Sequence, residues 1–230
     1  MNDRVKLAIE MKLMNKSYIS GDSQLHVLKD VNFSIVNGES AIILGKSGSG
    51  KSTFLHLVGG LDKADSGNLV VAGNCLEVMK ERALERYRRT CVGFIFQSHY
   101  LLDDFTLLEN IYLPAIMCGA KKKQAIAYAN ELIDQVGLYD RKDHFPKRVS
   151  GGERQRAAVA RALINDPDII LADEPTGNLD EYNSKIVEDI LFSLAETSHR
   201  TLVMVTHDIS MRFRCTHAYK LFLGKLEPFE

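Results

Sequence analysis

The segment from Gly45 to Ser52 has the residue types and the spacing of a phosphate-binding loop. It reads Gly45-Lys46-Ser47-Gly48-Ser49-Gly50-Lys51-Ser52, which is the pattern G-x-x-x-x-G-K-S. Its glycines let successive backbone N–H groups point at an anion, Lys51 reaches the β- and γ-phosphates, and the Ser52 hydroxyl can ligate Mg²⁺. The sequence therefore predicts a nucleoside triphosphate site made by Gly45, Ser47, Gly48, Ser49, Gly50, Lys51, Ser52 and Thr53.

The residues around this loop fit the mechanism. The apolar run Ala41-Ile42-Ile43-Leu44 precedes it, and a helical pattern from Thr53 to Val58 follows it. A strand, a loop and a helix in this order place the phosphates at the N-terminus of the helix, where the dipole and the free N–H groups favour an anion.

A second anion site is predicted at Val149-Ser150-Gly151-Gly152-Glu153, which opens a helix expected from Arg154 to Asn165. Ser150 is a natural N-cap, and Gly151 and Gly152 allow close approach of the backbone. An ordinary capped helix with a Gly-Gly turn is the simpler alternative. One polypeptide cannot easily fold two remote phosphate sites onto one nucleotide.

Polar side chains stand at the ends of further buried strands. The run Asp168 to Glu174 reads as a buried parallel strand that ends in the carboxylates of Asp173 and Glu174. A second apolar run, 201–205, ends at Thr206-His207-Asp208, and the run 92–96 ends at Gln97. Carboxylates beside a phosphate loop are the groups that organise Mg²⁺ and activate water in phosphoryl transfer.

Together these motifs resemble those of the ATP-binding-cassette (ABC) ATPases, from about Ile9 to Leu226. The resemblance implies ATP and Mg²⁺ as cofactors, with Ser52, Gln97 and Asp173 at the metal. It implies that Glu174 is the general base, that His207 contacts the γ-phosphate and that Gln97 senses the metal and the attacking water. The residue Glu153 departs from the family, whose signature usually ends in Gln.

The same resemblance implies a composite site between two cassettes. Ser150, Gly151 and Gly152 would cap the γ-phosphate on the other chain's loop, and Asp180 lies in a loop that touches the opposite subunit. Tyr18 stands where the family places an aromatic ring against adenine, although a tyrosine near an N-terminal strand is more often plain core. Two copies of this chain would suffice to form complete composite sites, and a heterodimer with another cassette stays open.

Composition narrows the function classes. The chain has 230 residues, 45% hydrophobic and 26% charged, which are globular values, and a net charge of −1. No global basic field recruits nucleic acid or anionic lipid. Its four cysteines form no C-x-x-C pair and read as reduced. The sequence has no long apolar run and no signal-peptide pattern at Met1–Arg4, so it does not predict insertion into a membrane.

The predicted fold is α/β: one ABC cassette, a P-loop NTPase over residues 1–230. The core lobe takes residues 1–97 and 166–230, with a mostly parallel sheet from runs 41–44, 92–96, 168–172 and 201–205. Short strands near 6–13 and 27–36, with 69–72, form an N-terminal antiparallel lobe. A helical subdomain spans about 98–165, with Thr106 as an N-cap and a helix from Lys121 to Val136 whose lysines are a solvated start.

The segment from Phe96 to Phe105 is expected to form a groove for a transmembrane permease, with aromatic and leucine walls and acidic lips from Asp103 and Asp104. Leu101, Leu102 and Phe105 can also pack inside the helical subdomain, and this packing is compatible with a permease groove. Further motifs, Gly59-Gly60-Leu61-Asp62 and Ala172 to Asp180 among them, resemble the lipoprotein-releasing (LolD-like), macrolide-export and FtsE-like group of cassettes. That group works at the cytoplasmic face of the inner membrane.

Two alternatives of other classes remain open. A soluble ABC ATPase acting on DNA or ribosomes would need coiled coils, a second cassette or zinc modules, and this sequence has none of these patterns. A non-catalytic adaptor is disfavoured by the presence of both Glu174 and His207.

Overall fold

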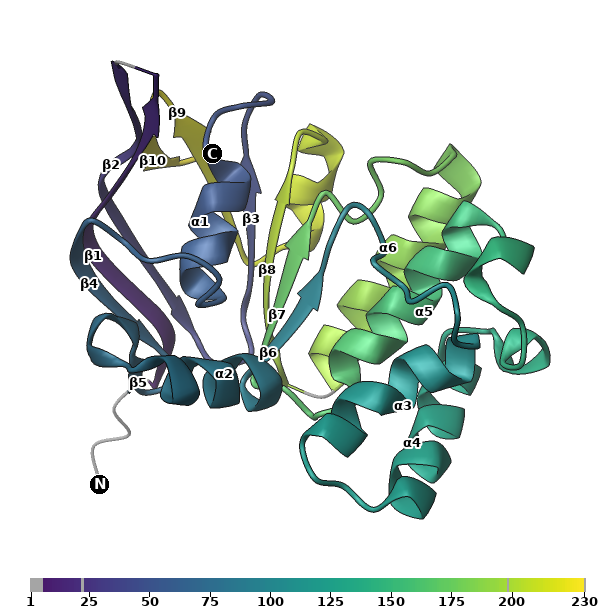
Figure 1. The fold of residues 1–230 in the computed structure, drawn as a ribbon. Coiled ribbons are helices and arrows are strands. Elements are labelled where there is room, and N and C mark those ends of the chain that lie inside the picture. The colour runs from purple at the N-terminus through teal and green to yellow at the C-terminus, as the bar shows by residue number, and fades with distance from the viewer. Residues whose placement is uncertain (1–5, 22, 198, 230) are drawn as a thin grey trace, which may run out of the picture.

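A six-stranded sheet, built from described residues of the chain, runs through the middle of the molecule (Figure 1). The computed structural model describes residues 6–21, 23–197 and 199–229, so the prediction for Met1–Arg4 lies outside them. The strand order is β10-β9-β3-β8-β7-β6, and neighbours are parallel from β9 to β6. The strands are β3 (Ser40–Leu44), β6 (Val92–Ile95), β7 (Ile169–Asp173), β8 (Thr201–Thr206), β9 (His217–Phe222) and β10 (Lys225–Pro228).

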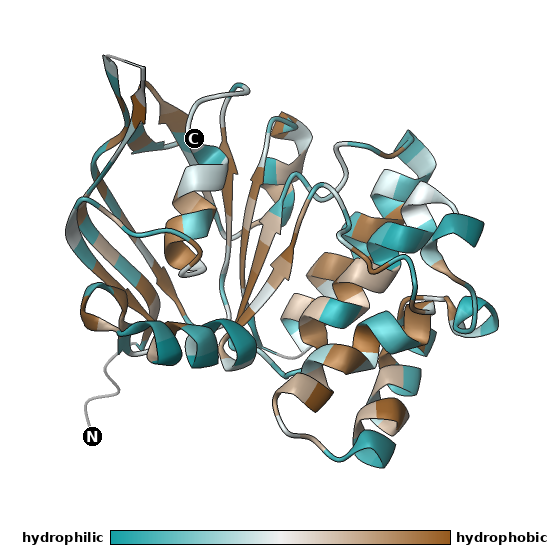
Figure 2. Ribbon diagram, in the orientation of Figure 1, coloured by the Kyte–Doolittle hydropathy of each residue, from teal (hydrophilic) through white to brown (hydrophobic). Residues whose placement is uncertain are grey.

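The central strands β3, β7 and β8 are buried on both faces, which explains their unbroken apolar runs (Figure 2). Alternate side chains enter different cores. Ile42 and Leu44 pack with the helices on one face, whereas Ala41 and Ile43 pack with the antiparallel lobe on the other. The four runs predicted from the sequence are all strands of this sheet, and β9 and β10 extend it.

The antiparallel sheet has the order β2-β1-β4-β5, with strands β1 (Leu7–Ser20), β2 (Ser23–Val36), β4 (Ser66–Val71) and β5 (Asn74–Cys75). The first two strands are much longer than predicted. Register shifts after Met11, Met14 and Lys16 break the regular alternation, and Leu13 has a φ of 48° there. Such bulges let a strand continue through polar residues, so the alternation in the sequence ends before the strand does. Tyr18 therefore lies within β1.

The helices start where their caps predict. Thr106 caps α3 (Leu107–Met117), with Glu109 completing a capping box, and Ser150 caps α5 (Gly151–Leu163) in the same way with Glu153. The other helices of the described residues are α1 (Lys51–Val58), α2 (Glu81–Thr90), α4 (Lys122–Gln135) and α6 (Glu181–Thr197), with short 3₁₀ turns η1 (Leu76–Val78), η2 (Tyr139–Arg141), η3 (Pro146–Arg148) and η4 (Ile209–Arg214). Helix α2 was not predicted, because it buries only Leu84 and Tyr87.

Buried Asn110 fixes the loop that leads into α3. Its Nδ2 donates to the carbonyl oxygens of Leu102, Phe105 and Thr106 at 3.0, 3.1 and 2.9 Å, and its Oδ1 accepts from the Leu102 N–H at 2.7 Å. A side chain that is 2% exposed and makes these bonds holds the whole turn in one shape. Within the described part of the chain, no helix is long and apolar enough to span a bilayer.

Candidate functional site

A cavity of about 720 Å³ lies at the carboxyl ends of the parallel strands, where α1 begins. In open α/β sheets this edge is where ligands bind. The cavity brings together predicted residues from five segments of the chain, and Val27 and Lys46 join them. The predicted members are Tyr18, Ser47, Gly48, Gly50, Lys51, Ser52, Thr53, Gln97, Asp173, Glu174 and His207.

The phosphate loop wraps the N-terminus of α1. Gly50 precedes the helix with a φ of 101°, and a Cβ at this position would lie 2.8 Å from Val27 Cγ1, so a side chain is excluded on both counts. Gly45 packs closely against the side chain of Ser49, since a Cβ on Gly45 would lie 2.5 Å from Ser49 Oγ. The N–H groups of the first turn of α1 then face the cavity.

The ammonium group of Lys51 is 6% exposed and is satisfied within the loop. Its Nζ donates to the carbonyl oxygens of Gly45 and Lys46 at 2.8 and 3.1 Å, and Glu174 Oε1 lies 3.3 Å away. A buried cation with this mobile stem, aimed into an anion cradle, is suited to phosphate oxygens.

The carboxylate of Glu174 is held from its other side by two residues. His207 Nδ1 lies 2.8 Å from Glu174 Oε2, and the Thr206 hydroxyl donates to the same oxygen at 3.3 Å. The backbone of Glu174 has a φ of 44°, and its N–H donates to the Val205 carbonyl. Strained backbone at a residue that faces a ligand cavity is typical of a functional carboxylate.

Asp173 lies deeper and differs in its electrostatics. Burial raises the pKa of its carboxyl group, and the hydrogen bond from the Ser52 hydroxyl opposes that rise. A hydroxyl and a carboxylate in contact, with the Gln97 amide in the same cavity, form a set of hard oxygen donors that fits Mg²⁺. These residues therefore suit the metal that the sequence predicts.

Gln97 is exposed and is tied to the loop after β7. The Asn178 side chain donates to the Gln97 carbonyl at 3.3 Å, and Gln97 Nε2 donates to Asn178 Oδ1 at 3.5 Å. Asn178 is a member of the segment 178–180 that the sequence singled out. The two loops therefore respond to each other directly.

Tyr18 reaches the cavity from β1 and is 38% exposed, so it is not plain core. Its hydroxyl donates to Asp62 Oδ2 at 2.7 Å, and Lys16 Nζ lies 4.9 Å from the ring centre. Burial raises the pKa of the Tyr18 hydroxyl, and the hydrogen bond to Asp62 raises it further. The ring is thereby held at one orientation at the rim of the site.

Ser150, Gly151, Gly152 and Asp180 form a separate cluster that does not line this cavity. Gly152 packs against α6, since a Cβ there would lie 2.3 Å from Asn183 Oδ1. Asp180 accepts from the backbone N–H and the side chain of Asn183 at 2.9 and 2.7 Å, and the first of these bonds lowers the pKa of Asp180. Both helix N-termini therefore present one joint surface.

Sequence reasoning missed a clamp made by α5. Gln155 is fully buried, donates to the Phe96 carbonyl at 3.2 Å and accepts from His99 Nδ1 at 2.6 Å. Arg161, two turns further along, donates to the carbonyls of His99 and Tyr100 at 2.7 and 2.5 Å. The signal in the sequence that could have revealed this clamp was Gln155, a polar residue within the helix predicted to follow Ser150.

A second cavity, of about 520 Å³, lies along the edge strand β6, from Val92 at its start to Phe96 and Tyr100 in the segment that follows it. Phe96 and Tyr100 form walls, as expected. Neither Asp103 nor Asp104 lines this cavity; Asp103 pairs with Lys147 at 3.1 Å and lines a smaller cavity, of about 350 Å³, together with Tyr100 and Leu101. Leu101 packs into the helical core. The charged residues of the lining are Arg88, Arg89 and Arg161.

Comparison with known proteins gives close matches along nearly the whole chain. A family model described as ABC transporter matches residues 28–177. The lipoprotein-releasing system ATP-binding protein LolD of Treponema denticola is 48% identical over 93% of this chain and 95% of its own. The protein of the same name from Treponema pallidum is 46% identical over 98% and 99%. A dimeric structure of a post-hydrolysis state of the ATP-binding cassette MJ0796 bound to ADP and Pi has a TM-score of 0.89 at 35% identity, covering 96% and 99%.

The clamp makes a prediction for Gln155→Leu. The substitution leaves the Phe96 carbonyl and His99 Nδ1 without their buried partner, so we expect the free energy of unfolding to fall by about 2–3 kcal/mol. Nucleotide affinity should stay within about threefold, because Gln155 lies outside the first cavity. Denaturant unfolding and nucleotide titration measure the two effects. Gln135→Leu, at an exposed site on α4, is the control, and equal stability of the two variants would contradict the clamp.

Proposed function

Because this chain belongs to the ABC transporter family of ATP-binding cassettes, we propose that it is the ATP-hydrolysing subunit of a transporter that releases lipoproteins from a membrane. Two copies close on ATP and drive a permease. The observation that carries the proposal is the single cavity that gathers Lys51, Asp173, Glu174 and His207, while Ser150 to Gly152 lie elsewhere.

Hydrolysis needs a base beside the γ-phosphate. The carboxylate of Glu174 is oriented by His207 and Thr206, so it accepts the proton of a water molecule as that water attacks phosphorus. Lys51 binds the β- and γ-phosphate oxygens, and the first turn of α1 binds the remaining negative charge. When Lys51 binds phosphate instead, the Glu174 carboxylate loses its cationic partner and is free to accept a proton from the water molecule.

Magnesium, when bound, would neutralise part of the negative charge of the phosphates. Ser52 and Asp173 would hold it, with Gln97 as a further ligand. Tyr18 stacks on the adenine ring, at the rim where Asp62 fixes its orientation.

The second half of the site comes from another chain. The N-terminus of α5 at Ser150 and Gly151 is open and carries a positive dipole end, which fits a γ-phosphate. Gly151 has no backbone neighbour near its missing Cβ, and Leu179 Cδ2 is 3.6 Å away. A second copy that faces this surface completes two equivalent sites by two-fold symmetry.

The permease docks at the second cavity, where a short segment with apolar side chains fits between Phe96, Tyr100 and Met117. The chain then lies at the cytoplasmic face of the inner membrane, bound to a partner rather than inserted. Export of macrolides and a role in cell division are related possibilities of the same group. The names of the Treponema proteins favour lipoprotein release.

Glu174→Gln tests the base. The amide keeps the size of the side chain and cannot accept the proton, so we expect turnover to fall by about 10²- to 10⁴-fold. ATP affinity should be retained, because Lys51 and the loop are unchanged. Phosphate release and ATP titration measure the two quantities. Hydrolysis at the wild-type rate would remove Glu174 from this role.

Ser150→Arg tests the composite site. The variant has an intact phosphate loop, so it should bind ATP normally and yet hydrolyse almost none, because it spoils only the partner's site. Mixing it with Glu174→Gln is the sharper measurement. A mixed dimer holds one complete site, so we expect about a quarter of wild-type turnover from an equal mixture of two inactive proteins. An inactive mixture that still forms mixed dimers would contradict the model.

Affinity capture tests the transporter assignment. We expect tagged Glu174→Gln, with ATP and Mg²⁺, to recover a permease with few membrane spans and a large extracytoplasmic domain from detergent-solubilised membranes. Mass spectrometry identifies it. Adding Tyr100→Asn should reduce recovery at least fivefold, since Tyr100 lines the second cavity and asparagine tolerates its φ of 47°. Tyr139→Asn, also on an exposed tyrosine, is the control. Recovery of only nucleic-acid or ribosomal partners would overturn the assignment.

A further inference from the structure

We propose that the face around the second cavity contacts anionic lipid headgroups of the membrane. The inference rests on the proposed function, because a permease bound in that cavity brings this face toward the bilayer. The net charge of −1 rules out a global positive field but not a local one.

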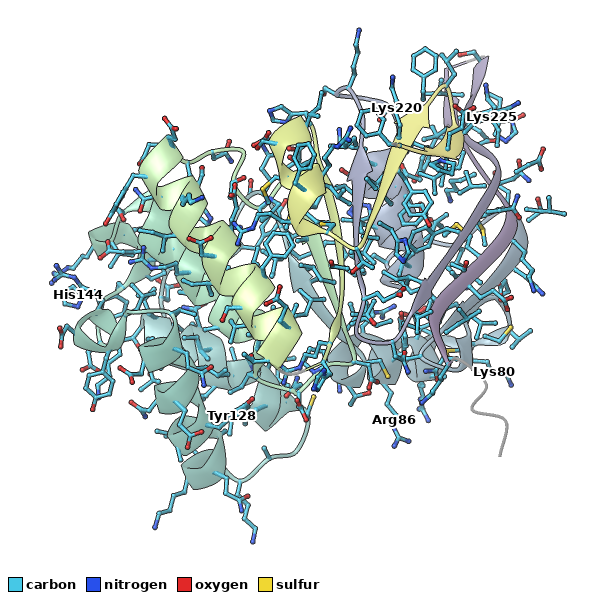
Figure 3. All side chains as sticks on the ribbon, turned by 180° about the vertical axis from the view of Figure 1, so that it is seen from behind. Lys80, Arg86, Tyr128, His144, Lys220 and Lys225 are labelled. Atoms are coloured by element: carbon cyan, nitrogen blue, oxygen red, sulfur yellow. The ribbon has the colours of Figure 1, made fainter. Side chains whose placement is uncertain are left out.

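Helix α2 carries a stripe of arginines on its outer side. Arg82, Arg86 and Arg89 follow one another at helical spacing and are all exposed, whereas Leu84 and Tyr87 are buried on the other side. Figure 3 shows Arg86 and the neighbouring Lys80 pointing away from the body of the molecule. Within the described residues, none of the three arginines takes part in a salt bridge.

A second basic segment lies beside the end of this stripe. Cys118, which follows α3, has its Sγ 3.8 Å from the Arg89 carbonyl, and Asn165 donates to the same carbonyl at 3.0 Å. The exposed lysines 121–123 come directly after that contact and open α4. The two basic segments therefore flank one cavity, to which Arg89 and Met117 both contribute. We call this set, Lys80, Arg82, Arg86, Arg89 and lysines 121–123, the basic rim.

Acidic residues offset the basic rim only in part: Glu85 is exposed on α2 between Arg82 and Arg86, against the seven basic residues of the rim. Glu81 is paired with Arg88 at 2.8 Å, and Arg88 also donates to the Gly60 carbonyl, so both are occupied within the fold. From Cys118 to Asn130 the chain has no Asp or Glu. Exposed charges act over about 8 Å at physiological ionic strength, so the rim presents its own local field despite the overall balance.

A lipid surface fits the rim better than a folded partner. Its cations are long, exposed side chains spread along two elements, with no cradle between them for a fixed acidic group. Such an arrangement suits a fluid layer of negative charge, in which each lysine or arginine strengthens binding about fivefold. Arg89 is the rim residue that also lines the cavity, and the other rim residues flank it, which leaves the cavity to the permease segment.

Vesicle sedimentation of the full chain tests the inference. We expect binding to vesicles of phosphatidylcholine with phosphatidylglycerol, little binding to phosphatidylcholine alone, and weakening as salt rises. Arg82→Glu with Arg86→Glu should lower affinity at least tenfold. Glutamate near the start of α2 complements its dipole, so the helix should persist. Lys220→Glu with Lys225→Glu changes the charge equally at the other end of the molecule and should bind as wild type (Figure 3).

Several results would overturn the lipid contact. These are equal binding to both vesicle types, an equal loss in the Lys220 and Lys225 variant, or tighter binding to a DNA duplex than to the anionic vesicles. ATP hydrolysis without membranes should match wild type in both variants, which reports their folding. Permease capture separates the two proposals. Capture of a permease without vesicle binding would contradict only the lipid contact, and vesicle binding without capture would contradict only the transporter assignment.

Discussion

The buried ammonium of Lys51 is the charge around which the site is arranged. Taking such a cation out of water is costly, so the fold must surround it with acceptors. The carbonyls of Gly45 and Lys46 and the carboxylate of Glu174 do so. The same carboxylate is held by His207 and Thr206. In the proposed mechanism, binding of phosphate to Lys51 therefore changes the electrostatics of Glu174, the proposed base, and substrate binding prepares catalysis through one shared contact.

Helix α5 connects the places where the proposed partners meet the chain. Its N-terminus carries Ser150 and faces a second cassette, while its C-terminal end reaches the second cavity at Ala162. Between these ends, Gln155 and Arg161 hold the segment that follows Gln97 through its backbone carbonyls. In the proposed assembly, a permease that presses on this segment moves helix α5, whose N-terminus we propose to face the γ-phosphate of the other chain. The buried side chain of Gln155 and the partly buried side chain of Arg161 fix the two joints.

The sequence predicted those features that local chemistry determines. The continuous apolar runs of β3, β7 and β8 lie where both sheet faces are covered, and Thr106 and Ser150 cap helices through their own side chains. The parts that failed depend on distant residues. The length of β1 is set by bulges against β2, and the function of Gln155 depends on a carbonyl that lies far away in the chain. Asp103 was expected at the lip of the permease groove, but its pairing with Lys147 from another turn places it at a smaller cavity that shares Tyr100 with the second one. Roles such as adenine stacking by Tyr18 stay predictions.

The direction of the chain produces two faces of opposite electrostatic preference. In a parallel sheet with crossover helices, helix N-termini gather at one end and C-termini at the other. Helix α1 shows both consequences: its N-terminus opens onto the phosphate loop, and its C-terminal end at Gly60 accepts from Arg88. The C-terminal ends of α2, α3 and α5 also meet at the second cavity, where Arg89 and Arg161 lie. Carbonyl ends attract cations, so a fold that binds an anion at one edge accumulates basic side chains at the other. The first cavity and the arginines of the second cavity are in this sense two results of one topology, whereas Lys80, Arg82 and lysines 121–123 of the basic rim lie at helix N-termini and are not explained by it.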